Sequence, residues 1–234
     1  MRVPALSSAP EVFLRVAAAH LASLEADPDT SVLAEPVRAA TERLRLAGQR
    51  RQLAWEAATA KLALRERADY EMDRTVREVH AMVLAAAGGD RNRGPYCEVF
   101  PTGLVKILTA PLTRALELLR GLESRLENTL TLASQAGGIR LACQKLDEAS
   151  RSYTSAVHEE AEAAAELELA KTEWRRQYRA SYGGLLDLLG DRARVESYFL
   201  PVRGAPQSDE DSQVCLTCPS ERGNHAKRGQ ENDR

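Results

Sequence analysis

The sequence predicts an all-α protein: an elongated antiparallel bundle of three long helices plus one short N-terminal helix, with a disordered C-terminal tail. Apolar residues recur at steps of three and four over long stretches, the spacing of a buried helix face. No proline interrupts residues 37–87, and Gly48 is the only glycine there. From residue 203 onward the composition turns polar and the periodicity ends. We therefore expect a helical domain over 1–202 and a disordered polar tail over 203–234.

The composition allows a real but thin hydrophobic core. Of the 234 residues, 44% are hydrophobic and only 5% are aromatic, so Ala and Leu must supply most of the buried surface through close helix contacts. The formal net charge of -2 does not call for a polyanionic partner. The chain has neither the apolar core of a secretory signal nor an apolar run of membrane-spanning length. We therefore expect a soluble, cytoplasmic protein.

The first helix is expected to run from Ser8 to about Ala26. Ser8 and Glu11 have the spacing of a capping box, in which a hydroxyl and a carboxylate satisfy free N–H groups at a helix start. Asp27, Pro28 and Asp29 should stop the helix. Its predicted inward face consists of Phe13, Val16, Ala17, His20 and Leu24.

The second helix is expected to start between Ser31 and Pro36 and to end at Ala87. At about 1.5 Å per residue it would be a rod of roughly 75 Å, far longer than an ordinary globular helix. The stretch 88–103 mixes turn residues with apolar ones. We expect it to lie as a loop against the end of the bundle.

The third helix shows the most regular apolar ladder and should end in a turn at Gly137 and Gly138. Pro111 predicts either a fresh helix capped by Thr109 or a kink. The ladder consists of Leu104, Leu108, Leu112, Ala115, Leu119, Leu122, Leu126, Leu130 and Ala133.

The fourth helix is expected over about Ile139 to Leu189. Two polar residues, Glu160 and Lys171, occupy apolar positions of its ladder. A break at Gly183 and Gly184 is plausible, because glycine costs about 1 kcal/mol relative to alanine in a helix.

A segment rich in aromatic and arginine side chains is the candidate interface. If the second, third and fourth helices pack side by side, part of the fourth projects beyond the shorter third helix. The segment then either packs against the loop through Tyr96 and Phe100 or forms an intermolecular surface, where such residues are enriched. The candidate interface residues are Trp174, Arg175, Arg176, Tyr178, Arg179 and Tyr182.

Metal and cofactor sites are not predicted. The Glu-x-x-His pairs of metal-binding bundles are absent, and the acidic run from His158 to Glu168 is typical of a solvated face. Cys215 and Cys218 form a Cys-x-x-Cys pair without the second pair that structural zinc needs. This pair has no function on this interpretation, or it belongs to a site completed by another chain. We expect reduced thiols.

Catalytic motifs are also missing: no nucleophile elbow, Walker loop or dinucleotide-binding turn occurs. Arginine clusters at 43–51, 74–77 and 175–179 have phosphate-binding chemistry, but acidic residues interleave with the first two. The leading hypothesis is a non-enzymatic scaffold or adaptor that self-associates or binds a protein partner, with no cofactor and no identified small-molecule substrate. The alternative is a bundle that binds membranes or nucleic acid through its arginine clusters.

Overall fold

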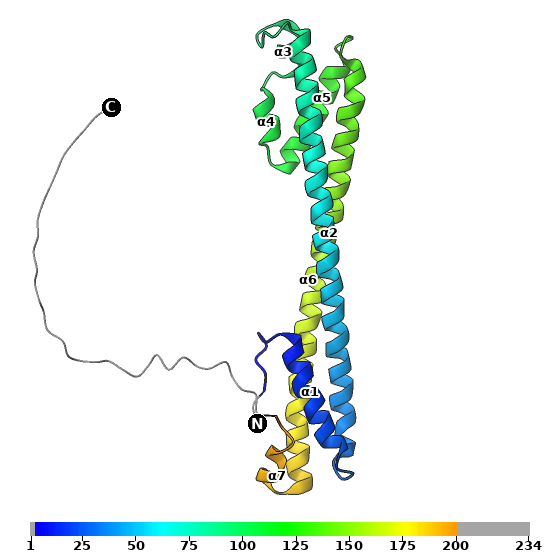
Figure 1. Ribbon diagram of the computed structural model, residues 1–234, viewed down its shortest axis with the longest axis vertical. Helices are drawn as coiled ribbons and strands as arrows, with labels where there is room; N and C mark the ends of the chain where they lie inside the picture. The colour runs from blue at the N-terminus through cyan, green and yellow to red at the C-terminus, as the bar shows by residue number, and fades with distance from the viewer. Residues whose placement is uncertain (1–2, 201–234) are drawn as a thin grey trace, which may run out of the picture. The chain divides into compact units, whose positions relative to one another are not determined.

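The computed structural model describes residues 3–200, and all regular elements in this range are helices. Two very long helices, α2 (Ala34–Ala86) and α6 (Ala133–Leu189), dominate the unit. They run side by side and cross near their middles, as Figure 1 shows. The predicted all-α antiparallel bundle is therefore confirmed. The tail predicted over 203–234 lies outside the described residues.

The N-terminal helix α1 (Pro10–Glu25) buries the predicted inward face in full. Its start differs from the prediction: Ala9 is the N-cap residue, and no side chain caps the helix. Pro10 takes the first turn, where its missing N–H is harmless, and this moves the start beyond the reach of Ser8. A short 3-10 turn, η1 (Ser31–Leu33), then leads into α2.

The stretch 88–103 contains a short helix, α3 (Gly94–Val99), instead of being only a loop. Tyr96, Val99 and Phe100 are buried, so the segment lies against the bundle end as predicted. Tyr96 and Phe100 pack around His80 of α2, with ring centroids 5.5 and 5.3 Å from its imidazole.

The predicted third helix is divided at Pro111 into α4 (Leu104–Leu108) and α5 (Leu112–Glu127), so a fresh helix begins there and the chain does not merely kink. Thr109 does not cap this helix, because Pro111 is its N-cap residue and no side chain caps it. The turn out of α5 occurs at Asn128–Leu132 and not at Gly137 and Gly138, which lie in the first turns of α6. Leu130, a predicted ladder residue, is 97% exposed in that turn. Helix packing of Ala136 and Ile139 outweighs the low helix propensity of the two glycines.

Helix α6 continues unbroken through Gly183 and Gly184 and ends at Gly190, which has the left-handed conformation (φ 64°) that favours glycine at a helix end. A final short helix, α7 (Arg192–Glu196), packs on the end of α6.

A third layer of helix covers α2 and α6 only at their two ends. Helix α1 covers one end, and α5 with α3 and α4 covers the other (Figure 1). The expected side-by-side packing of three long helices is therefore wrong, because α5 has only 16 residues against 57 in α6. Between the covered ends lies a section of two helices, about residues 50–65 of α2 and 154–166 of α6, which we call the neck.

Alanine substitutions at glycines test the extent of α6. Gly137 and Gly183 are helical, and an added Cβ would meet nothing within 4 Å at either position. We expect Gly137→Ala and Gly183→Ala each to raise the free energy of unfolding by about 0.5–1 kcal/mol in urea titrations. The matched control Gly190→Ala should lower it, because φ is positive there. If Gly137→Ala instead lowered the free energy of unfolding, residues 137–138 would form a turn and would not be part of α6.

Candidate interaction surface

The aromatic residues of the predicted interface lie in the core. Trp174 and Tyr178 are both 0% exposed. The indole Nε1–H of Trp174 donates to Thr41 Oγ1 of α2 at 3.1 Å, and its ring meets Phe13 of α1 edge-on at 5.4 Å between centroids. Tyr178 stacks on Trp174 at 4.7 Å, and burial raises the pKa of its phenol to about 12.

These contacts correct the prediction for Trp174 and Tyr178, which are unavailable to a partner in this fold. The segment also does not meet Tyr96 and Phe100, since those residues pack at the opposite end of α2. The reason is direction: α6 is antiparallel to α2, so its C-terminal half lies beside the start of α2 and beside α1. Helix α1 covers the start of α2, as the short turn between them requires. The apolar ladder did not reveal that the chain reverses at Pro111, and this reversal brings the C-terminal half of α6 to the same end.

The arginines of the same segment stay at the surface. Arg176 pairs with Glu173 at 2.9 Å, and with Arg175 and Arg179 it lines a shallow concavity of about 240 Å³. Tyr182 is half-buried and tilts against Phe199. A role for Arg175, Arg176, Arg179 and Tyr182 in binding stays a prediction.

A buried histidine ties this end together. His20 of α1 is 0% exposed; its Nδ1–H donates to the carbonyl oxygen of Tyr198 at 2.9 Å. In the neutral ring Nε2 accepts the Ser181 hydroxyl proton at 2.8 Å, in place of the carbonyl oxygen of Tyr178, which lies 2.9 Å from the same hydroxyl. Burial lowers the pKa of His20, which favours this neutral form. The ring also stacks on Phe199, so α1, α6 and the segment after α7 are held at one point.

The lysine that interrupts the apolar ladder of α6 is buried and satisfied. The ammonium group of Lys171 donates to the carbonyl oxygen of Leu6 at 3.0 Å and pairs with Glu168 at 2.8 Å. It also lies 5.9 Å from the centre of the Phe13 ring. Lys171 therefore fixes the segment that precedes α1.

The neck has a poor interior. Its facing residues are small or charged: Ala58 and Ala163 are buried, whereas Arg65 and Glu160 are half-buried between the helices. The Arg65 guanidinium lies 5.5 Å from the centre of the Tyr153 ring. Two helices joined through alanines bury far less apolar surface than the three-helix ends.

Large apolar side chains instead point outward along and beside the neck. Leu53 is 66% exposed, Trp55 51% and Leu64 56% on α2, and Leu169 is 72% exposed on α6. Exposed apolar residues scattered singly are ordinary, whereas a series along one helix pair is a candidate interaction surface.

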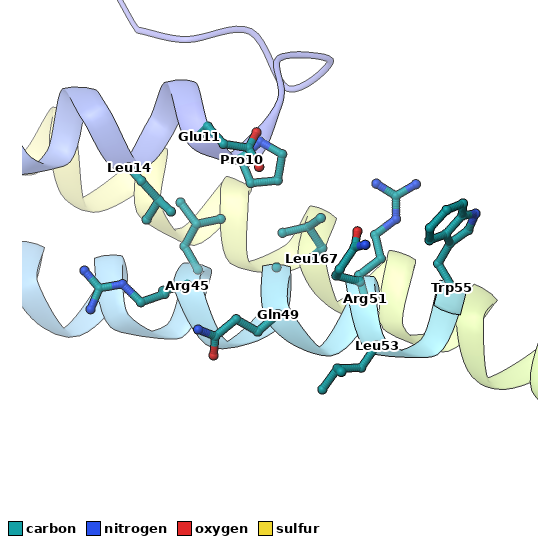
Figure 2. Close-up of a pocket in the computed structure, with 12 residues that line it drawn as sticks. Pro10, Glu11, Leu14, Arg45, Gln49, Arg51, Leu53, Trp55 and Leu167 are labelled. Atoms are coloured by element: carbon teal, nitrogen blue, oxygen red, sulfur yellow. The ribbon is translucent and has the colours of Figure 1, made fainter. Parts of the chain in front are cut away.

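A groove of about 1000 Å³ opens where α1 begins, between α1, α2 and α6. Figure 2 shows Pro10 and Leu14 of α1 above it, Leu167 of α6 at its back, and Arg51 and Trp55 of α2 rising at its open end. Pro10 lies close to Gly48, with 3.8 Å between its Cβ and the position of an added Cβ. The groove continues along α2 and α6 from the place where α1 begins, and both apolar and polar side chains line it.

Charged groups along α2 and α6 are largely engaged within the chain. The arginines at 45, 74 and 77 pair with acidic residues of their own helix, and Arg50 reaches Glu166 across the two helices at 2.6 Å. Among residues 3–200, no group of three or more His, Cys, Asp or Glu residues has an arrangement suited to a metal ion. Cys215 and Cys218 lie outside the described residues. No helix within 3–200 combines the length and the apolar character that crossing a membrane requires.

Comparison with known proteins returned no match: no protein-family model, no curated protein and no solved structure resembles the chain.

Substitution of Trp174 tests its place in the core. We expect Trp174→Ala to lower the free energy of unfolding by about 3–5 kcal/mol, because it removes a buried ring and leaves a cavity. Arg176→Ala should change it by less than about 0.5 kcal/mol, since the Arg176–Glu173 pair is exposed. Chemical denaturation of both variants checks this. A small effect at Trp174 would contradict the packing described above.

Stability should depend on pH through His20. The pKa of His20 is lower in the folded chain than in the unfolded chain, so on acidification the unfolded chain binds a proton at His20 before the folded chain does. The contribution is complete above about pH 6.5, the ordinary histidine pKa, and is lost as the pH falls below it. Thermal unfolding between pH 8 and 5 should show this decline. His20→Gln should reduce the decline, and the part that comes from His80, whose pKa burial also lowers, should remain. The matched control His158→Gln, whose side chain is 78% exposed, should leave the decline unchanged. An equal slope in His20→Gln would overturn the assignment.

Proposed function

We propose that this chain is a non-enzymatic structural or adaptor protein that self-associates through the faces of its long α2–α6 pair. The observation that carries the proposal is the neck, where Ala58 and Ala163 fill the interior and Leu53, Trp55 and Leu64 lie outside. A two-stranded antiparallel coiled coil of this kind gains stability when further helices cover its apolar side chains. The cytoplasm, where we expect the protein, contains such helical scaffolds as ordinary components.

The arrangement also supports an interaction role because the two ends act as anchors. At each end a three-helix core holds α2 and α6 together through fully buried side chains, such as Leu44 and Trp174 at one end and Val76 and Leu119 at the other. The neck is thereby presented as a fixed surface of two helices. A surface that is already ordered loses little entropy when it binds.

The alternative, binding to membranes or nucleic acid through arginine, receives less support. Five of the clustered arginines are engaged in ion pairs within the chain. Phosphate groups would have to compete with the acidic side chains for these arginines.

Solution mass measures the proposal directly. Sedimentation velocity of the full chain at 1–100 µM should show species heavier than the 25.7 kDa protomer, with a proportion that rises with concentration. A strict monomer throughout, together with no partner protein recovered on the immobilised chain, contradicts the proposal. Binding to duplex DNA or anionic vesicles that disappears at high salt would favour the alternative.

A further inference from the structure

One side of the α2–α6 pair is open from end to end. At the α1 end, a concavity of about 390 Å³ is lined by α2 and α6 alone, with Leu46, Arg50 and Leu169 among its residues. At the α5 end, a second concavity of about 300 Å³ is again lined only by these two helices, including Glu71 and Leu141. Neither concavity includes a residue of α1 or α5.

Sequence spacing joins the two concavities into one face. In helices that wind around each other, residues seven apart stay on the same side. Arg50 and Glu71 are separated by three such steps, and Leu169 and Leu141 by four. We call this side the back face. Between the concavities it carries Leu53, Ala57, Ala60 and Leu64 on α2, and Glu148, Ser155 and Glu162 on α6.

The two helices of the neck carry net charges of opposite sign. Residues 50–67 of α2 hold five basic and two acidic side chains, a net charge of +3. Residues 151–166 of α6 hold four acidic and one basic side chain, a net charge of -3 with histidine neutral. The two stretches lie at the same level, because Arg50 meets Glu166 at one end and Arg65 meets Tyr153 at the other.

We infer that a second copy of this chain covers the back face, related by a two-fold axis that runs along the helices; this inference rests on the proposed self-association. Two identical faces can be laid together about an axis along the helices or across them. The first places α2 of each copy against α6 of the other, so the basic stretch of one copy lies against the acidic stretch of the other. The second places α2 against α2 and α6 against α6, so like charges meet. Charge complementarity selects the first arrangement.

The resulting assembly is sterically open and large enough. Helices α1 and α5 lie away from the back face in both copies, since neither contributes to its two concavities. A strip two helices wide and about 80 Å long exceeds the roughly 800 Å² per partner of a standard interface. Both copies then have their α1 ends together.

Two measurements on the full chain test the inference. In sedimentation equilibrium, Ala57→Glu with Leu64→Glu should weaken dimerisation at least tenfold. The matched control Val105→Glu with Leu130→Glu, at sites 69% and 97% exposed and off the back face, should leave it unchanged. Equal effects of the two pairs overturn the inference.

The direction of pairing is read from Cys97, an exposed thiol in α3. With Cys215→Ser and Cys218→Ser, a spin label on Cys97 should report an intermolecular distance below about 50 Å, a few helix diameters. The axis across the helices would separate the labels by about 80 Å or more. A dimer with only the long distance leaves self-association standing and overturns the two-fold along the helices. A strict monomer overturns both proposals.

Discussion

The constraint on which this structure depends is the antiparallel pairing of α2 with α6 over their whole length. The pairing fixes which residues share a level, so Arg50 meets Glu166 near one end and Arg65 meets Tyr153 farther along. Every other helix is positioned by it: α1 fits between the start of α2 and the end of α6, and α5 between the remaining halves. Because both covering helices have 16 residues, they leave the middle of the pair to two helices alone.

This division of the chain links stability to interaction. The ends contain the large buried side chains. At one end these include Phe13, Trp174 and Tyr178, together with the buried His20 and its hydrogen bond to the carbonyl oxygen of Tyr198. They therefore account for most of the apolar surface buried on folding. The neck contributes little burial but displays leucines and a separation of charge. A protein that acts by association gains from this arrangement, because the exposed leucines of the neck are not used up in its own core.

Much of the fold follows from sequence, and the failures have physical causes. Periodicity predicted α1, its inward face and the unbroken length of α2, because long apolar ladders leave few alternatives. Gly137 and Gly138 misled because glycine propensity is a weak local term that tertiary packing overrides. The larger error concerned direction: the chain reverses at Pro111, so α5 runs back toward α3, where Arg125 donates to the carbonyl oxygen of Val99, and α6 becomes antiparallel to α2. Trp174 and Tyr178 therefore pack against α1 and do not lie on an overhanging surface. The open back face follows only from knowing which sides α1 and α5 cover, which no residue pattern states.

Amide hydrogen exchange, resolved by segment and followed over protein concentration, tests the central claim most directly. The account predicts that dilute protein exchanges faster over residues 50–65 and 154–166 than over the covered ends, and that protection of these neck segments rises as the chains associate. Uniform protection along α2 and α6 at all concentrations would contradict it, since the neck would then be as fully supported as the ends.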